Sequence, residues 1–405
     1  MTKRCLTLSA ISVAVVLLGC THNQRPEEPQ HSGTQAESPV LVGEATAVAV
    51  TPLNQTVLRY RGKALSGSRW GLVGDLQHSM NAALEACGKS PLQLDGIFGK
   101  NSREGLRRLA SCPDFADLSM AEGEEHDGHV TVGIWTRLNE NSPTPVAIGR
   151  AFVLWLTHEG TDYDVAEFNI SSNGTPQPND PKSFLTWGPY GATVGHGAEV
   201  QRILSSPELA SVLASCFGTE LTALQTLLPL RKEAARPLMT EIASTPARRS
   251  AWKAAFKCLG SEKLVRDAYE RLAWGQDWFM PNVRALAKIV TDSGSQVSET
   301  DFAMFVDIGM HMTVTNQRIQ AVKTALAAPN LPNPLSSAAR RQAIGQALVA
   351  TLSNQIEDRR GRNVVYYVDG IGEANLSAAE RQAWQTRSGL KASDLGLADQ
   401  PLPIP

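Results

Sequence analysis

Two segments of this 405-residue chain combine residue types that can cleave a bond between sugars. Residues 157–164 (THEGTDYD) place Glu159 where an apolar stretch ends, and residues 187–197 (WGPYGATVGHG) place Thr193 among glycines. A carboxylic acid that stays protonated near neutral pH can donate its proton to the leaving oxygen of a glycosidic bond. The two segments therefore predict a site for glycan cleavage.

The apolar stretch before Glu159 predicts a buried helix. Apolar residues recur at helical spacing across residues 146–158, two prolines precede them, and Gly160 follows, where it can provide a left-handed cap. Glu159 then sits at the negative end of the helix dipole, one turn after Trp155. Both the dipole and an apolar neighbour disfavour the ionised form of a carboxyl group, which suits a general acid.

An inverting glycosidase also needs a second carboxylate, about 6.5 to 9.5 Å from the acid, to activate water. Asp180 is the first candidate because it lies in a loop-rich stretch, and Glu167 and Glu199 follow it. We expect Asp180 and Thr193 to manage the water. If no second carboxylate serves, one acid suffices for the chemistry of lytic transglycosylases, in which the substrate's own hydroxyl attacks.

Aromatic and acidic residues near the two segments are candidates for substrate binding. Asp162 and Tyr163 closely follow the acid, where they would orient it or bind sugar hydroxyls. Trp187 and Tyr190 can stack on sugar rings because their flat apolar faces carry a polar edge. Packing in the core is the alternative for each aromatic side chain. The His residues of both segments lack metal-ligand spacing, so we expect no metal and no other cofactor.

The N-terminus predicts export and anchoring. Basic residues precede an apolar run at residues 6–18, too short to span a membrane, so residues 1–19 are predicted to be a signal peptide. Leu-Leu-Gly-Cys, ending at Cys20, resembles the bacterial lipobox, whose Cys is lipidated, and Thr21 resembles the outer-membrane sorting pattern. Residues 20–56 are polar without periodicity and predict a disordered tether. We therefore expect a lipid-anchored protein on the periplasmic face of the outer membrane.

The amino-acid composition limits the classes of possible partner and predicts disulfides. A net charge of −2 with 19% charged residues argues against a nucleic-acid partner. Once the signal peptide and the lipidated Cys are set aside, an even number of cysteines remains, which in an exported protein indicates two disulfides. These cysteines are Cys87, Cys112, Cys216 and Cys258. Three pairings are possible, but Cys87 with Cys112 and Cys216 with Cys258 each lie within one segment of the expected fold.

Residues 57–118 predict a small module of helices. Apolar residues recur at helical spacing over residues 72–84, and residues 95–99 (DGIFG) predict a tight turn, followed by a helix with Asn101 or Ser102 as its N-cap. This order resembles the peptidoglycan-binding module of wall hydrolases, although the Gln usual late in the second helix is absent. The resemblance implies peptidoglycan as a partner. A packing module without a ligand is the alternative.

Residues 128–405 are dominated by helical patterns, and only residues 168–193 form a long stretch, rich in Gly and Pro, without a helix. A buried helix ending in Glu159, an irregular lobe and the stretch at residues 190–197 resemble the lysozyme superfamily, in particular phage-type lysozymes and chitosanase-like proteins. The resemblance implies a mainly α fold: a lysozyme-like helical domain with a small irregular lobe, beside the small three-helix peptidoglycan-binding-like domain. Phage lysozymes also carry an Asp shortly before the Thr, where this chain has Trp or Gly.

These observations predict a cell-wall glycan hydrolase, similar to muramidases, with Glu159 as general acid. A lytic transglycosylase is the alternative within enzymes. The missing second carboxylate favours a third possibility, a lipoprotein that binds peptidoglycan through a lysozyme-like scaffold without cleaving it.

Overall fold

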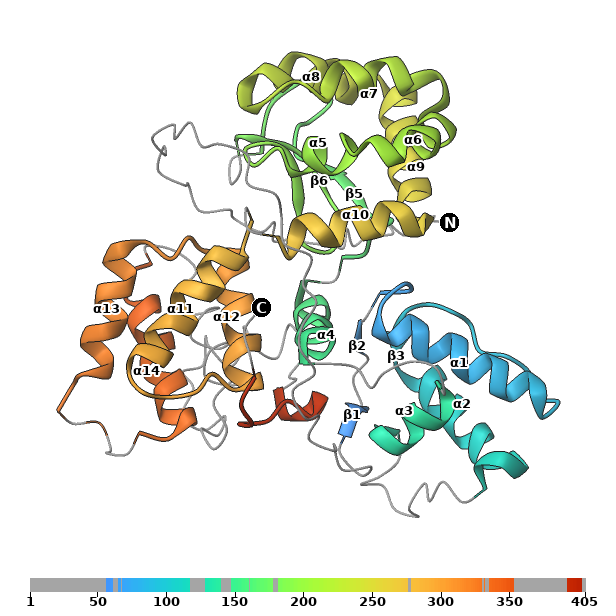
Figure 1. The fold of residues 1–405 in the computed structure, drawn as a ribbon. Helices are drawn as coiled ribbons and strands as arrows, with labels where there is room; N and C mark the ends of the chain where they lie inside the picture. The colour runs from blue at the N-terminus through green and yellow to red at the C-terminus, as the bar shows by residue number, and fades with distance from the viewer. Residues whose placement is uncertain are drawn as a thin grey trace, which may run out of the picture.

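The computed structural model describes residues 56–60, 65–66, 68–116, 128–139, 147–159, 161–177, 181–275, 278–329, 331, 335–352 and 392–402. The protein is mainly helical, which confirms the predicted class. Three groups of elements surround one central helix (Figure 1). We call them the N-terminal module (residues 56–138), the sheet lobe (residues 165–275) and the C-terminal bundle (residues 278–352). The predicted signal peptide, the tether and Cys20 lie outside the described residues.

The N-terminal module contains three helices and two short sheets. Its elements are β1 (Thr56–Arg59), β2 (Leu65–Ser66), α1 (Leu72–Ala86), β3 (Ile97–Phe98), α2 (Lys100–Ala110), η1 (Pro113–Phe115), β4 (His129–Thr131) and α3 (Val132–Leu138). Strand β1 pairs with β4, and β2 with β3. Because β4 and α3 follow the polar connector and still belong to this unit, the module continues beyond residue 118.

The Asp95–Gly99 turn lies in the module as the sequence predicts. Gly96 has a φ of +68°, and the Phe98 side chain is buried. The buried amide of Gln77 donates to the Asp95 carboxylate (2.8 Å) and accepts from the Gly96 N–H (2.9 Å). The N-cap prediction is wrong: Gly99 caps α2, because the Ser102 hydroxyl is used inside, where it donates to the Ile97 carbonyl.

The sheet lobe places an antiparallel sheet, in the order β5-β6-β7, among helices. Its elements are β5 (Ala166–Phe168), β6 (Ser183–Trp187), β7 (Ala192–Gly195), α5 (Glu199–Leu204), η2 (Pro207–Leu209), α6 (Ala210–Phe217), η3 (Gly218–Glu220), α7 (Leu221–Leu227), η4 (Lys232–Ala235), α8 (Arg236–Ser244), α9 (Pro246–Ser261) and α10 (Lys263–Ala273). The stretch expected to be irregular thus contains a regular sheet. Most residues of β6 and β7 are buried on both faces, which removes the alternation that would have indicated strands.

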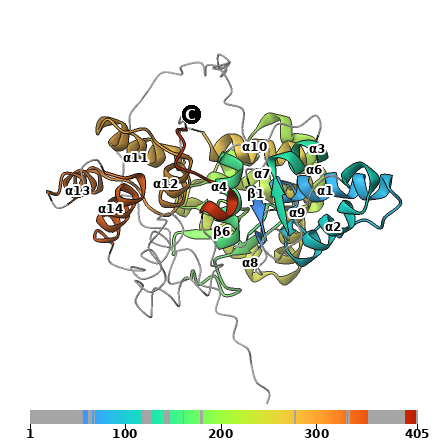
Figure 2. The same cartoon turned by 90° about the horizontal axis from the view of Figure 1, so that it is seen from below.

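The C-terminal bundle packs beside the central helix. It consists of α11 (Met280–Asp292), α12 (Glu299–His311), α13 (Asn316–Leu326) and α14 (Ser337–Val349), and the short helix η6 (Ala392–Leu395) follows. Side-chain caps start three of these helices: Ser298 for α12, with a complete capping box to Asp301, Thr315 for α13 and Ser336 for α14. Seen from below, the bundle and the N-terminal module lie on opposite sides of the molecule (Figure 2).

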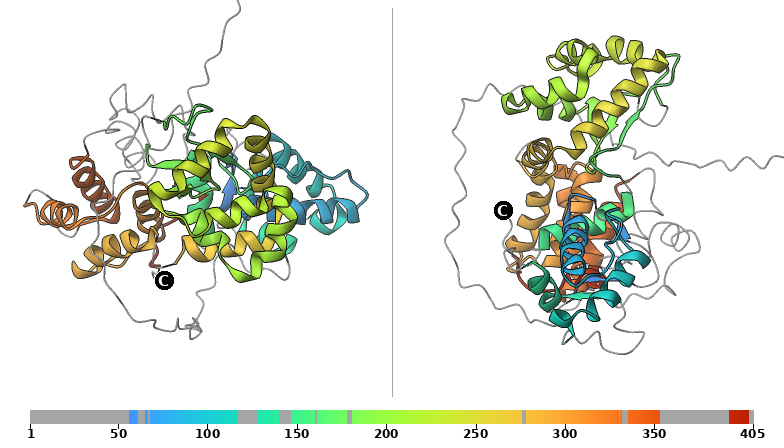
Figure 3. Two further views of the ribbon diagram at one scale, coloured as in Figure 1. Left: turned by 90° about the horizontal axis from the view of Figure 1, so that it is seen from above. Right: turned by 90° about the vertical axis from the view of Figure 1, so that its right-hand side faces the viewer.

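The central helix is α4 (Ala147–Glu159). Its side chains from residue 151 to residue 156 are all buried, as expected of a helix enclosed by protein. It contacts α1 and β2 of the N-terminal module, α12 of the bundle, and η6. The sheet lobe lies above it, on the side of its C-terminal end (Figures 1 and 3). Helix α4 therefore belongs to the core that all three groups share.

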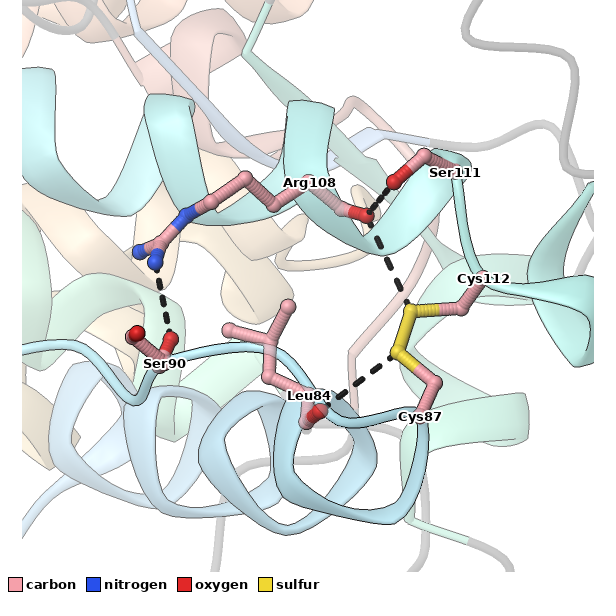
Figure 4. Close-up of a disulfide and its surroundings, with 6 residues drawn as sticks. All are labelled: Leu84, Cys87, Ser90, Arg108, Ser111 and Cys112. Atoms are coloured by element: carbon pink, nitrogen blue, oxygen red, sulfur yellow. Dashed lines mark hydrogen bonds between the residues drawn. A yellow bond between two sulfur atoms is a disulfide. The ribbon is translucent and has the colours of Figure 1, made fainter.

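Two disulfides support the outer groups. Cys87 pairs with Cys112 in the module, and Cys216 pairs with Cys258 between α6 and α9, with Cα–Cα distances of 5.8 and 5.6 Å. Both pairings are those favoured by the sequence. By loop entropy each contributes about 3 to 4 kcal/mol. In Figure 4 the first disulfide closes the end of α1 onto the end of α2, beside Arg108, whose guanidinium donates to the Ser90 carbonyl.

Among the described residues, none of the helices has the length and apolar character needed to span a bilayer.

Candidate functional site

The end of α4 packs against the turn between β6 and β7. The Trp155 indole donates to the Pro189 carbonyl (3.0 Å), and the Phe152 ring lies 4.8 Å from the Tyr190 ring. Glu159 is the last residue of α4, one turn beyond Trp155, as predicted. Its side chain lies outside what the structure describes. The helix end that carries Glu159 therefore lies beside the turn of the three-stranded sheet.

The segment after α4 joins two groups of the molecule. The Asp162 carboxylate accepts hydrogen bonds from the Ser68 hydroxyl (2.7 Å) and the Arg69 N–H (3.1 Å), both in the N-terminal module. Burial raises the pKa of Asp162, and these hydrogen bonds lower it by less. The buried Tyr163 ring points to the sheet lobe, where its hydroxyl donates to Glu270. The two predicted binding residues therefore face opposite ways, toward different partners.

Two predicted stacking residues are in the core. Trp187 is 0% exposed and its indole donates to the Tyr163 carbonyl (2.6 Å), while its ring packs against Phe256. Tyr190 is 4% exposed and its backbone N–H donates to the Tyr269 hydroxyl (3.2 Å). Neither ring presents a face to solvent here. Both side chains support the site from within the core, because they hold the β6–β7 turn against α10.

Thr193 lies in β7 on the polar face of the sheet. Strand register aligns Glu167, Thr186 and Thr193 in one row across β5, β6 and β7. Thr193 is 2% exposed: its hydroxyl donates to Glu199 (2.8 Å) and accepts from the Gly197 N–H (3.2 Å). Both hydrogen-bonding roles of this hydroxyl are therefore satisfied within the protein, where they fix the turn from β7 into α5.

The candidates for a second carboxylate differ in their surroundings. Glu199 is buried, bonded to Thr193 and 3.6 Å from Arg202. Glu167 is exposed and accepts from the Lys253 ammonium (2.6 Å). Asp180 lies outside the described residues. Of these three, both carboxylates that the structure describes thus have partners already.

A carboxylate that the sequence did not single out lies in the middle of this region. Glu270 of α10 accepts hydrogen bonds from the Tyr163 hydroxyl, the Tyr190 hydroxyl (3.1 Å) and the Trp274 indole (2.6 Å). Burial, the largest influence, raises its pKa, and the three neutral donors lower it by less. A carboxyl group in this environment can hold or release a proton at a higher pH than an exposed Glu does. Glu270 and its three donors are referred to below as the Glu270 cluster.

Helix α10 explains how the Glu270 cluster forms. Arg266, Glu270 and Trp274 are spaced four residues apart, so they form one stripe along the helix, and all three are partly exposed. The opposite side of α10, with Val265 and Tyr269, is buried in the sheet lobe. This stripe of one cation, one acid and one indole was the available sequence signal. The stripe alone did not indicate a function, because the two tyrosine partners of Glu270, Tyr163 and Tyr190, are 107 and 80 residues away in the chain.

No known protein family, curated protein or solved structure matches this chain.

Proposed function

We propose that this protein is a cell-wall glycan hydrolase, similar to muramidases, with Glu159 as general acid. The observation that carries the proposal is the Glu270 cluster, which joins a partly buried carboxyl group, two phenols and an indole beside the segment that follows α4. Aromatic rings with polar edges suit sugars, and a low-polarity surrounding favours a protonated acid. The sequence resemblance to phage-type lysozymes supports the same chemistry.

In this proposal the residues have separate roles. Glu159 protonates the leaving oxygen, and Asp180 activates water. Thr193 holds the turn from β7 into α5 in place, because its hydroxyl is bonded to Glu199 and to the Gly197 N–H. Tyr163, Tyr190 and Trp187 support the site, and the partly exposed Trp274 offers an aromatic surface to the substrate. The lipid on Cys20 and the N-terminal module hold the protein near peptidoglycan, at the periplasmic face of the outer membrane.

One observation favours a lytic transglycosylase as second candidate. Glu167 is paired with Lys253, and Glu199 with Thr193 and Arg202, so neither carboxylate is an unpaired candidate for the base. A single-acid reaction needs no such base, since the substrate's own hydroxyl attacks and an anhydro sugar forms. The same observation is compatible with a lipoprotein that binds peptidoglycan without cleaving it.

The test is Glu159→Gln in the full chain. We expect clearing of purified peptidoglycan in a zymogram to fall by a factor of about 10² to 10⁴, because a general acid contributes that much. Glu208→Gln, which removes an exposed carboxylate paired with Arg271, is the matched control and should clear normally. Unchanged clearing by Glu159→Gln contradicts the assignment of the acid. Products with 1,6-anhydro ends identify a transglycosylase, and sedimentation with peptidoglycan without soluble product identifies a binding protein.

A further inference from the structure

Ser68 has an unusual backbone for a residue other than glycine. It lies between β2 and α1 with a φ of +62°, in the left-handed region, and is 5% exposed. A non-glycine residue held there costs about 1 kcal/mol or more, so its surroundings must compensate. Such strain is concentrated at functional sites, and Ser68 faces the segment that follows α4.

The polar groups of Ser68 and its neighbour compensate this strain. The Ser68 hydroxyl donates to Asp162 Oδ1 (2.7 Å) and accepts from the Trp70 N–H (3.1 Å), while the Ser68 carbonyl accepts from the Gly74 N–H (3.2 Å). The Arg69 N–H donates to Asp162 Oδ2 (3.1 Å). Both carboxylate oxygens of Asp162 are therefore held by the N-terminal module.

Close backbone contacts fix both sides of this connection. A Cβ on Gly74 of α1 would lie 2.0 Å from the Arg69 carbonyl oxygen, so only glycine lets the Ser68 loop lie against α1. On the other side, a Cβ on Gly260 of α9 would lie 2.4 Å from the Tyr163 carbonyl oxygen. The segment at residues 161–164 is thus enclosed between the module and the sheet lobe.

Charged side chains extend the contact at its solvent side. Arg69 lies 3.5 Å from the Asp164 carboxylate, and the guanidinium carbons of Arg69 and Arg266 lie 5.7 and 5.0 Å from the centre of the Trp70 ring. Each guanidinium is within the range of a cation–π contact. Arg266 starts the stripe on α10 that leads to Glu270, so the connection reaches the Glu270 cluster.

We propose that Ser68 is a positioning residue: through Asp162 it fixes the segment at residues 161–164 and so the end of α4 that carries Glu159. The N-terminal module is then a structural part of the cleavage site as well as a wall-binding unit. The expected effect on catalysis rests on the proposed function, but the connection from Ser68 through Asp162 to the segment at residues 161–164 does not. Misplacing a catalytic group by about 1 Å can reduce a rate about 100-fold.

The experiment compares Ser68→Gly with Ser68→Ala in the full chain. Glycine adopts a positive φ without strain, so Ser68→Gly removes the hydroxyl and still folds. Ser68→Ala removes the same hydroxyl and keeps the strain. Ser111→Gly is the control, because it deletes an exposed hydroxyl elsewhere in the module, where Ser111 donates only to the Arg108 carbonyl (Figure 4). Two quantities are measured: amide hydrogen exchange of residues 161–165, and kcat and KM on soluble glycan fragments.

We expect Ser68→Gly to raise hydrogen exchange at residues 161–165 about tenfold, as loss of one part-buried hydrogen bond to a carboxylate implies. We expect kcat to fall about 10- to 100-fold with KM changed less than about threefold, and sedimentation with peptidoglycan to be unaltered. Exchange equal to that of Ser111→Gly overturns the proposal, whatever the activity. Unchanged kcat in an active enzyme also overturns it. An inactive wild-type protein refutes the proposed function alone, because hydrogen exchange still reports the link.

Discussion

Asp301 is a buried carboxyl group and Glu270 a partly buried one, and their hydrogen-bonding partners differ in kind. Asp301 of α12 lies 2.5 Å from Arg340 and 3.2 Å from Arg341, two buried cations. Glu270 receives two phenols and an indole and, among the described residues, no hydrogen bond from a cation. The ion pairs with two buried arginines make Asp301 a structural anchor. Neutral donors permit either protonation state, which is the property that catalysis uses.

From this contrast we expect the largest loss in the free energy of unfolding when Asp301 is changed. Asp301→Asn keeps the shape of the side chain but removes one of the carboxylates that pair with the buried Arg341, which is 0% exposed. Breaking a buried ion pair on one side costs about 3 to 5 kcal/mol. Urea unfolding measures the loss, and Asp292→Asn, which removes an exposed partner of Lys288, is the control. A loss in the free energy of unfolding below about 1 kcal/mol would show that Asp301 is not an anchor.

A smaller and pH-dependent effect is expected for Glu270→Gln. The folded-state pKa of Glu270 is raised by burial, so its contribution to stability is fully present below the unfolded-state pKa and is lost as pH rises through the folded-state pKa. Gln does not titrate. We expect the variant to lose about 1 to 3 kcal/mol at low pH, because one amide cannot accept all three donors, and less near neutral pH.

Urea unfolding of wild type and Glu270→Gln across this pH range measures the difference in free energy. A difference that grows with pH would show that the carboxylate, not the protonated acid, is the form favoured by folding. In that case Glu270 would resemble Asp301, and the contrast between the two groups would fail.

The smallest effect is expected at the surface. Glu167→Gln breaks an ion pair with Lys253 in which both side chains are largely exposed. Such pairs contribute about 0.2 to 1 kcal/mol and are screened by salt. The melting temperature should therefore change little, and any change should disappear at high salt. If glycan cleavage falls strongly instead, Glu167 is the second carboxylate, and its partner Lys253 does not prevent that role.

Local patterns predicted local features correctly. The end of α4 at Glu159, the DGIFG turn and both disulfide pairings follow from apolar spacing, glycine positions and short loops. The sheet was missed because β5 has only 3 residues, too few to establish an alternation, and the 4 residues of β7 are all buried.

Features that depend on distant contacts could not be predicted in this way. The partners of Glu270 are about 100 residues away, and no local pattern shows that two phenols converge on it. The sequence predicted that the Thr193 hydroxyl binds water. The hydroxyl instead donates to Glu199, six residues later in the chain, in a turn that buries both side chains. Side-chain types indicated the chemistry, whereas tertiary packing determined which groups have partners.

One contact of α4 also sets the order in which this protein can be assembled. The buried Arg150 guanidinium donates to Glu299 (2.7 Å) and to the Gly396 carbonyl (2.9 Å), which lie 149 and 246 residues later in the chain. A buried cation without these partners is costly, so α4 cannot settle in its final environment until they arrive. During synthesis α4 leaves the ribosome long before residue 396. The packing of the helix that ends in Glu159 therefore depends on residues late in the chain, and a chain interrupted before residue 396 lacks one of the two partners of Arg150.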